Sequence, residues 1–344
     1  MKDVLIVGSG FAGLSCAVEA VMRGLSFDCI DMLQDHTSTR IAAGIINPVT
    51  GRKYQLQEQY ADLFEAATVA YRKIEQLTGK TIMQQLPIFK MHKSEAALEA
   101  WIHASRQTEK STYINPTPSL QKWHKHIDYR YGSILVESGA RVDARQLFEG
   151  IHALHPVQRA TIQYVDIELK DDYCLWQQSM YKHIIFCEGY QVKNNPWFKH
   201  IHIRPSKGEC LLVRIPHFNC PVIVQKHTFI VPYGDDRYWV GGTNDFVADD
   251  DAPTETKQEE LLDGLRDTVR LAFEVEGHFA AIRPTMRDRR PAVGTHPEHQ
   301  QLLVLNGLGT KGALLAPYHA HMLFNKIFNQ MRIDPKVDVQ RFAL

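Results

Sequence analysis

The sequence predicts an α/β chain, α+β overall, with a Rossmann-like domain built from discontinuous segments and a second domain built on an antiparallel sheet. Three observations predict this fold class. The apolar run 4–7 leads directly into the glycine-rich stretch 8–13. Residues 210–244 contain successive runs that alternate like antiparallel strands. A pattern of strand, glycine loop and helix then returns at 302–328, so the chain leaves the first fold and comes back to it.

Local patterns predict the individual elements. Residues 4–31 have the pattern of a strand, a helix and a strand, which is a β-α-β unit. Gly24 is placed to end the helix of that unit, and Asp143 to cap a later one. The expected helices cover 11–23, 58–77, 94–107, 144–154, 255–273 and 312–328, and the expected strands cover 4–7, 27–31, 161–169, 183–189, 302–307 and several runs within 210–244.

Composition narrows the class of protein. The chain has 344 residues, of which 44% are hydrophobic and 23% charged, as in an ordinary soluble globular protein of about two domains. Its net charge is zero, which disfavours a nucleic-acid partner. The first apolar run is too short to cross a bilayer and has no signal-peptide pattern. We therefore expect a cytoplasmic location and no membrane span.

Cysteine and histidine spacing predicts no metal site. None of the six cysteines forms a C-x-x-C pair, so buried free thiols are the expected state. Three H-x-H pairs occur, but no cysteine joins any of them. Only the pair His124 and His126 is followed by a carboxylate at the same two-residue spacing, Asp128.

The glycine-rich stretch Gly8-Ser9-Gly10-Phe11-Ala12-Gly13 has the spacing of a dinucleotide-binding loop. In that motif Gly8 permits the tight turn, Gly10 lets a pyrophosphate approach the backbone, and Gly13 lets the helix pack on the strand. The helix N-terminus offers free N–H groups to the phosphates. Asp31, at the end of the second strand, can accept hydrogen bonds from a ribose 2′-hydroxyl and would repel a 2′-phosphate. The motif therefore predicts NAD or FAD and disfavours NADP.

Two distant segments favour FAD over NAD. Small residues Ala42-Ala43-Gly44 follow the second strand, as a loop that runs against a flat ring requires. Near the end of the chain, Gly307, Gly309, Thr310, Lys311 and Gly312 lie between a buried strand and a helix. The N-terminus of that helix can stabilise the anion that forms when a flavin is reduced. A nicotinamide enzyme does not need this feature.

Five stretches, taken in order, resemble the D-amino acid oxidase superfamily of FAD-dependent oxidoreductases, and within it the glycine oxidase and sarcosine oxidase branch. They are VLIVGSGFAGLSCA, STRIAAGIINP, GARVDARQLFEGI, RPSKGECLLVR with FIVPYGDDRYWVGGTND, and IRPTMRDRRPAVG with NGLGTKGALLAP. The resemblance implies non-covalent FAD, although His36 lies near enough in sequence to raise covalent attachment as an alternative. It also implies an FAD-binding domain of residues 1–85, 140–205 and 280–344, and a substrate domain of residues 86–139 and 206–279.

The resemblance further implies oxidation of the C–N bond of a small amine or amino acid, of the glycine, sarcosine or D-amino acid type. Hydride would pass to flavin N5, and oxygen or a quinone would accept the electrons. Arg283 matches the family position that pairs with a substrate carboxylate, and a structural ion pair is the alternative. The main chain of Val165 is the match for the adenine contact.

Other candidates carry two interpretations each. Tyr233 or Tyr238 can orient substrate, or both can simply pack on a half-buried sheet. Lys311 can assist electron transfer to oxygen. Glu188 stands where the family has a small residue, and Arg52 with Lys53 can bind an anionic group or stay exposed.

Two alternative functions share the predicted fold. One is a flavin domain that removes a carboxymethyl group from a modified tRNA uridine. The basic and aromatic stretch 122–132 favours it, and the zero net charge counts against it. The other is a flavin-binding protein without turnover.

Overall fold

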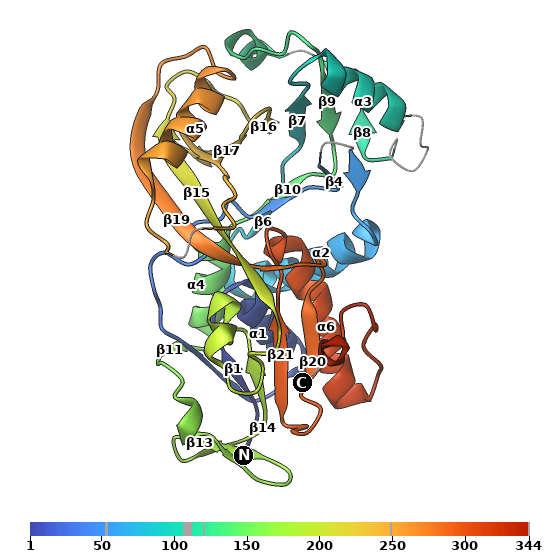
Figure 1. The fold of residues 1–344 in the computed structure, drawn as a ribbon, viewed down its shortest axis with the longest axis vertical. Coiled ribbons are helices and arrows are strands. Elements are labelled where there is room, and N and C mark those ends of the chain that lie inside the picture. Colours follow the sequence, from blue (N-terminus) through green and yellow to red (C-terminus); the bar gives the residue numbers. More distant parts are fainter. Residues whose placement is uncertain (52–53, 106–111, 120, 248–249, 343–344) are drawn as a thin grey trace.

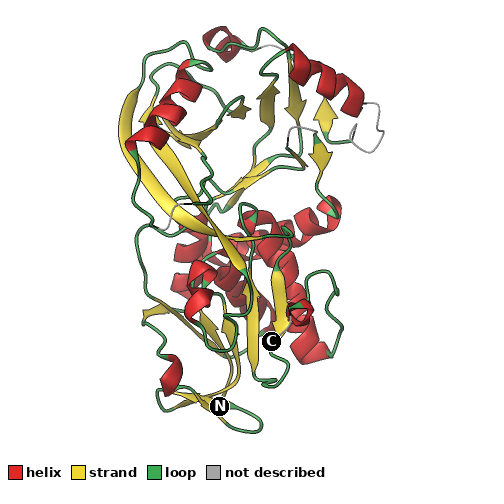
Figure 2. Cartoon of the chain, viewed as in Figure 1, coloured by secondary structure: helices red, strands yellow, loops and turns green. Residues whose placement is uncertain are grey.

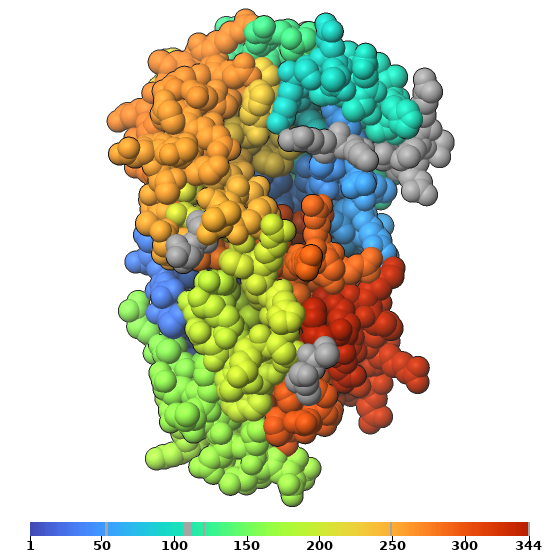
Figure 3. Space-filling view, viewed as in Figure 1, coloured from blue at the N-terminus to red at the C-terminus, as the bar shows by residue number. Residues whose placement is uncertain are grey.

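The computed structural model describes residues 1–51, 54–105, 112–119, 121–247 and 250–342. Two eight-stranded sheets organise these residues. One sheet lies in the lower half of Figure 1, with both termini, and the other lies in the upper half. Figure 3 shows that this face of the molecule is hollowed in its upper half, between blue and teal segments on one side and yellow and orange segments on the other.

The helices lie mainly against the lower sheet (Figure 2). The α-helices are α1 (Phe11–Arg23), α2 (Tyr60–Thr78), α3 (Glu95–Ser105), α4 (Ala144–Leu154), α5 (Glu255–Arg266) and α6 (Gly312–Asn329), and the 3-10 helices are η2 (Lys122–His126), η3 (Tyr164–Asp166), η4 (Gly189–Asn194) and η5 (Val339–Arg341). Within the described residues, no helix is both long and apolar enough to cross a membrane.

The strands are short except for two. They are β1 (Lys2–Val7), β2 (Phe27–Asp31), β3 (Ile45–Ile46), β4 (Val49–Thr50), β5 (Gln55–Leu56), β6 (Met83–Gln85), β7 (Ile88–Met91), β8 (Ile114–Asn115), β9 (Ser133–Val136), β10 (Ala140–Val142), β11 (Val157–Arg159), β12 (Glu168–Leu169), β13 (Cys174–Trp176), β14 (Ser179–Phe186), β15 (Ile203–Arg214), β16 (Ile223–Gln225), β17 (Phe229–Gly234), β18 (Arg237–Gly241), β19 (Glu274–Met286), β20 (Ala292–Thr295) and β21 (Leu302–Asn306). The long ones, β15 and β19, pair with each other over almost their whole length.

The lower sheet is parallel at its centre, in the order β11, β2, β1, β14, β21. Strands of this kind are buried on both faces, which explains their nearly continuous apolar sequences. Because parallel strands end at the same edge of a sheet, the residues that follow β1, β2, β14 and β21 meet there. The fold thus brings Gly8, Asp31, Glu188 and Gly307 to one edge.

Several helix ends follow the sequence signals. The bounds of α1 and β2 are those predicted, and Gly24 ends α1 in the left-handed conformation with φ of 65°. The Asp143 carboxylate accepts hydrogen bonds from the backbone N–H groups of Arg145 and Gln146 at the start of α4, both at 3.1 Å. A cap of this kind stabilises a helix by about 1 kcal/mol.

The upper sheet has the order β19, β15, β18, β17, β16, β7, β9, β8. Its pairs are antiparallel, as expected of the second sheet, except that β16 and β7 are parallel. One face packs against α5 around Leu211, Val240 and Leu265. The other face carries Val231 and faces the segment that contains Ala43.

Two expected elements are wrong. Residues 161–169 do not form one strand; they contain η3 and only the short β12. The side chain of Tyr164 turns inward to reach a distant partner, which breaks the alternation. The helix expected at 255–273 ends at Arg266. There the Thr268 hydroxyl bonds the Gly264 carbonyl, and Val269 pairs with Ile127 instead of continuing the helix.

The expected domain boundaries at 205/206 and 279/280 fall inside β15 and β19. These strands run from the upper sheet down to the lower half of the molecule (Figure 1). The division into an FAD-binding and a substrate domain therefore stays a prediction.

Candidate functional site: a glycine cradle and a half-buried guanidinium

The glycine-rich loop after β1 leaves no room for side chains at two positions. Gly8 has φ of +101°, and a Cβ added there would lie 2.5 Å from the Cys187 carbonyl oxygen. A Cβ at Gly13 would lie 1.7 Å from the Gly8 carbonyl oxygen. The absence of side chains at Gly8 and Gly13 therefore lets α1 start close to β1.

The N-terminus of α1 has free capacity to bind an anion. Its N-cap is Gly10, which offers no side-chain cap, and no acidic residue lies in the first turn. The Phe11 N–H donates to the Thr39 hydroxyl at 3.1 Å. Thr39 was missed from the sequence, because nothing local marks a threonine as the partner of a helix 28 residues away. The remaining N–H groups suit a phosphate.

Asp31 holds the glycine loop to the end of β2. Its carboxylate accepts hydrogen bonds from the backbone N–H groups of Ser9 and Leu33, each at 2.6 Å. A carboxylate has about four acceptor positions, so it keeps capacity for a ribose hydroxyl. The carboxylate predicted as a ribose ligand therefore also fixes the shape of the loop.

Glu188 has a structural reason for replacing a small residue. One carboxylate oxygen accepts from the Tyr164 hydroxyl at 2.7 Å, and the other accepts from the Asn195 amide at 2.8 Å. Burial raises the pKa of Glu188, although both hydrogen bonds oppose that shift. Val165 lies on the turn that Tyr164 anchors, with its side chain 91% exposed. Its main-chain contact with adenine stays a prediction.

The small-residue loop after β2 is clamped by the upper sheet. The Ile41 carbonyl accepts a hydrogen bond from Trp239 Nε1 at 2.8 Å, and the Ala42 carbonyl accepts one from the Tyr233 hydroxyl at 3.4 Å. Ala43 is buried. Gly44 has φ of +70°, and a Cβ there would lie 1.8 Å from the Val142 carbonyl oxygen. The loop is thus fixed between the upper sheet and β10.

The glycine loop before α6 meets the start of α1. A Cβ at Gly312 would lie 3.0 Å from the Phe11 ring, so the two helix N-termini approach each other. Gly307 and Gly309 both have positive φ, and Thr310 is exposed. Lys311 is the N-cap of α6 without a side-chain cap bond. Its ammonium donates to Gln57 Oε1 at 2.5 Å, and burial lowers the pKa of Lys311.

Together, these features fit FAD. Side chains at Gly8 and Gly13 would fill the space of the glycine loop. No side chain caps the N-terminus of α1, and Asp31 places a carboxylate at the end of β2. A second uncapped helix stands beside the first, as the flavin end of the cofactor requires.

Arg283, on β19, has a guanidinium without an acidic partner among the described residues. Its Nη1 donates to the Thr243 carbonyl at 2.8 Å and to the Asn244 amide oxygen at 3.0 Å. A Cβ at Gly208 would lie 1.9 Å from Arg283 Nη2, so the guanidinium lies across the bare backbone of β15. Burial lowers the pKa of Arg283. The ion pair that was the alternative interpretation is not seen in the described part of the chain, and the site suits an anionic ligand.

The two candidate tyrosines, Tyr233 and Tyr238, lie in different surroundings. Tyr233 lies at the small-residue loop, and the Arg141 guanidinium lies 4.0 Å from its ring centroid. Burial raises the pKa of Tyr233, so its hydroxyl stays neutral. Tyr238 is only 4% exposed, packs on Phe218, and its hydroxyl accepts from the Cys220 N–H at 3.2 Å. We therefore remove Tyr238 from the candidate site, because its side chain points into the core beneath α5.

The remaining candidates do not add to the site. Arg52 and Lys53 lie outside the described residues. The His36 ring lies 5.8 Å from the Phe279 ring. In the stretch 122–132, Trp123 and His124 are buried and stack on each other at 3.8 Å, so neither ring is free for a base. All six cysteines are free and buried, as predicted. No group of three metal-binding side chains is found in the described ranges.

Comparison with known proteins decides the family. The sequence profile of the family described as FAD dependent oxidoreductase (DAO) matches residues 3–325. The chain belongs to this FAD-dependent oxidoreductase family. FAD is accordingly its cofactor, and the resemblance found in the sequence is confirmed.

Relatives and solved structures extend the family assignment. The glycine oxidase of Bacillus subtilis is 26% identical over 242 residues, which are 62% of this chain and 60% of that protein. The bifunctional protein ThiO/ThiG of a Synechocystis species is 26% identical over 99% of this chain and 54% of its own length. The chain thus spans about half the length of the curated relatives it matches.

Solved structures confirm the predicted α/β fold class. A crystal structure of glycine oxidase from Bacillus cereus has a TM-score of 0.78 at 17% identity, with 96% of both chains covered. That of iminodiacetate oxidase from a Chelativorans species also has a TM-score of 0.78, at 20% identity, and covers 99% of this chain and 98% of the other.

Proposed function

We propose that the chain oxidises the C–N bond of a small amine that carries a carboxylate, such as glycine, sarcosine or a D-amino acid. One observation carries the proposal. Arg283 presents a half-buried guanidinium whose bonds in the described structure go to neutral acceptors. A partly desolvated cation of this kind is stabilised by a carboxylate ligand, which it can bind through two parallel hydrogen bonds. The names of the glycine oxidase relatives support the same class of substrate.

FAD, when bound, supplies the acceptor for the two electrons that leave the amine. We assign its adenine and pyrophosphate end to Gly8, Gly10, Gly13 and Asp31, with Phe11, Ala12 and the Val165 main chain beside them. We assign its ring end to residues 42–44 and to the 307–312 loop. Attachment is proposed to be non-covalent, and residues 1–85, 140–205 and 280–344 to form the FAD-binding domain.

The side chains around Arg283 have the task of orientation. Arg283 fixes the carboxylate end of the substrate and thereby orients the C–H bond of the neighbouring carbon. The protein need not supply an acid or a base for this task. Fixing reactants in this way removes much of the entropic part of the barrier. We assign the amine end of the substrate to the neutral Tyr233 hydroxyl, which lies at the small-residue loop that Trp239 also holds. Lys311 stays our candidate for assisting transfer to oxygen or a quinone.

Steady-state kinetics of the FAD-loaded protein test the proposal. The panel contains glycine, sarcosine, D-amino acids and proline, each with its uncharged amide as the matched control. We expect kcat/KM for the best carboxylated amine to exceed that for its amide by about 100-fold, the worth of a charge-assisted bidentate contact. Equal values for acid and amide would contradict a carboxylate-binding site.

Two other functions are outcomes of the same experiments. A protein that acts on modified tRNA would be retained on RNA at moderate salt. A tRNA-modifying bifunctional protein of Marinobacter nauticus matches 38% of this chain, but Trp123 and His124 of the stretch 122–132 are buried. A flavin-binding protein without turnover would show no activity with any amine. The cytoplasmic location stays a prediction.

A further inference from the structure

Residues 243–245, which follow β18, pair with β15 and carry the groups that hold Arg283. Asp245 follows β18 and pairs with Lys207 of β15. The Lys207 N–H donates to the Asp245 carbonyl at 2.7 Å, and the Asp245 N–H donates to the Lys207 carbonyl at 2.8 Å. The Glu209 N–H donates to the Thr243 hydroxyl at 2.9 Å. Thr243 is thereby bonded to β15 on one side and, through its carbonyl, to Arg283 on the other.

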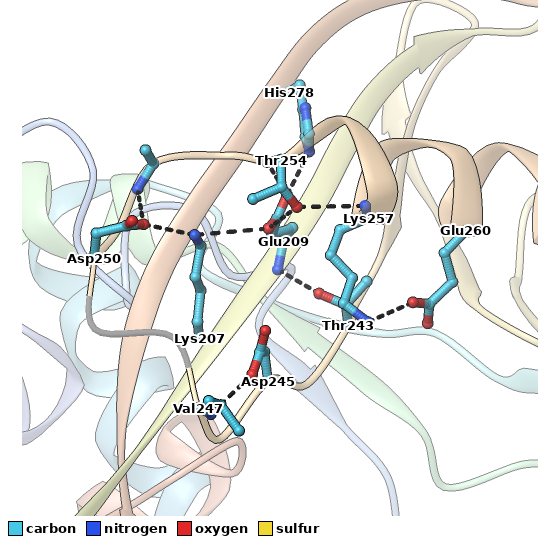
Figure 4. Close-up of polar contacts among 11 residues, drawn as sticks. Lys207, Glu209, Thr243, Asp245, Val247, Asp250, Thr254, Lys257, Glu260 and His278 are labelled. Carbon is cyan, nitrogen blue, oxygen red and sulfur yellow. Dashed lines mark hydrogen bonds and ion pairs between the residues drawn. The ribbon is translucent and has the colours of Figure 1, made fainter.

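A buried carboxylate fixes the far end of the same segment. Glu209 is 2% exposed, and its carboxylate accepts from both the N–H and the hydroxyl of Thr254, each at 2.9 Å. The Thr254 hydroxyl in turn caps α5 by accepting from the Lys257 N–H. Figure 4 shows these groups converging on Glu209 from the segment and from α5. One residue therefore holds both ends of the segment that begins at Thr243 and ends at Thr254.

Two nitrogen-bearing side chains lie beside this carboxylate. His278 Nε2, from β19, lies 2.8 Å from one Glu209 oxygen. Lys207, also 2% exposed, places its ammonium 4.0 Å from the other oxygen and 2.7 Å from Asp250. A buried carboxylate is costly unless it is paired and hydrogen-bonded. Here both conditions are met, so the position of the carboxylate is fixed.

The pleat of β15 places this cluster opposite Arg283. Side chains alternate between the faces of a strand, so Lys207 and Glu209 share one face and Gly208 belongs to the other. The guanidinium lies across Gly208 on that other face. Glu209 consequently cannot touch a ligand of Arg283 and can influence it only through the backbone and through Thr243.

We propose that Glu209 is the positioning residue for Arg283. Its carboxylate is anchored by Thr254 and His278, which fixes Glu209 on β15. The Glu209 N–H in turn holds Thr243, and Thr243 and Asn244 present the carbonyl and the amide that orient the guanidinium. This inference rests on the proposed function, in which Arg283 binds the substrate carboxylate. It adds a determinant of substrate affinity that lies outside the reach of substrate.

The test measures binding of acetate, a carboxylate without an amine, to the FAD-loaded protein by the change in flavin absorption. Glu209→Gln removes the charge and keeps the shape, whereas Glu260→Gln makes the same change at the exposed end of the network, where Glu260 contacts Lys257. We expect Glu209→Gln to raise the acetate Kd about tenfold and Glu260→Gln to change it less than about twofold. Thr254→Val, which removes one hydroxyl, should raise the Kd about threefold.

Two controls separate positioning from loss of the fold. The Kd of FAD, which binds at the other sheet, should stay within about twofold in every variant, a difference under about 0.5 kcal/mol. In the Arg283→Ala background Glu209→Gln should have no further effect on acetate, because residues that act through one another are not additive.

The outcomes distinguish this inference from the proposed function. The role of Glu209 would be overturned, and the proposed function would stand, if neither Glu209→Gln nor Thr254→Val changed the acetate Kd. The same conclusion would follow if Glu209→Gln had an equal effect with and without Arg283. An unchanged acetate Kd in Arg283→Ala would overturn the proposed carboxylate site and the role of Glu209 with it.

Discussion

Arg283 Nη1 and the Thr243 carbonyl form a hydrogen bond of 2.8 Å that joins β19 to the segment after β18. The Asn244 amide adds a second neutral acceptor to the same nitrogen. A guanidinium has five N–H donors, so these contacts orient it and leave donors and the whole positive charge for a ligand. This arrangement is the reason for assigning the carboxylate end of the substrate to Arg283.

Replacing Arg283 should weaken binding of carboxylated substrates selectively. We expect Arg283→Ala to raise KM for a carboxylated amine by about 100-fold, because a charged, doubly hydrogen-bonded contact is lost, and to change KM for the matching amide little. Arg287→Ala, at an exposed position of the same arginine-rich stretch, is the control and should leave both values unchanged. A Michaelis constant unaffected by Arg283→Ala would remove Arg283 from the site.

The glycine cradle can be tested by adding one methyl group. Gly13→Ala places a Cβ 1.7 Å from the Gly8 carbonyl, so α1 must move away from β1 and FAD binding should be lost. Gly24→Ala is the control, since its Cβ meets nothing within 4 Å. It should cost only about 1 kcal/mol of unfolding free energy, from its left-handed backbone. The measurements are the flavin bound per chain and the melting temperature; full FAD occupancy in Gly13→Ala would refute the cradle.

The two tyrosines should respond in opposite ways. Tyr238→Phe leaves the buried Cys220 N–H without its partner and should lower the unfolding free energy by about 1–2 kcal/mol while kcat/KM stays unchanged. Tyr233→Phe removes a hydroxyl at the loop that contains Ala42 and should lower kcat/KM with little effect on stability. Denaturant titration and kinetics on the same preparations check both. A kinetic defect in Tyr238→Phe alone would reverse the assignment.

The buried Glu188 predicts a pH-dependent stability. Because its pKa is raised from the usual value of 4.5, the folded protein binds more protons than the unfolded chain between that value and the raised one. Stability is therefore lost as the pH rises through this interval, and the loss is complete above the raised pKa. Glu188→Gln carries no such penalty.

The variant should accordingly gain stability relative to the parent at neutral pH, and the gain should shrink as the pH falls toward 4.5. Urea denaturation of both proteins across this range measures the difference. A gain of equal size at every pH would show that the ionisation of Glu188 is not its source.

Sequence reasoning predicted the parts of the fold that depend on local chemistry. The bounds of α1 and β2 follow from apolar runs and from Gly24, and Asp143 caps α4 as expected. The role of Gly13, whose Cβ would meet the nearby Gly8 carbonyl, follows from a steric limit that holds wherever a helix starts against a strand. Such features need no knowledge of distant residues.

The errors arise where distant contacts decide. A register shift between Pro232 and Gly234 changes which strand residues share a face, so the sequence alone could not separate Tyr233 from Tyr238. The alternation at 161–169 is broken because Tyr164 turns toward Glu188. Thr39 and Glu209 were missed for the same reason, since their partners are remote in sequence and neither belongs to a short motif.

Anaerobic reduction of the bound cofactor tests the central claim most directly. The protein is loaded with FAD, its visible spectrum is recorded without oxygen, and each amine of the panel is added with its amide as the control. We expect at least one small carboxylated amine to bleach the flavin absorption and its amide to do so far more slowly. Arg283→Ala should lose this difference. A loaded protein whose flavin absorption no carboxylated amine bleaches, or one that acid and amide bleach at equal rates, would contradict the central claim.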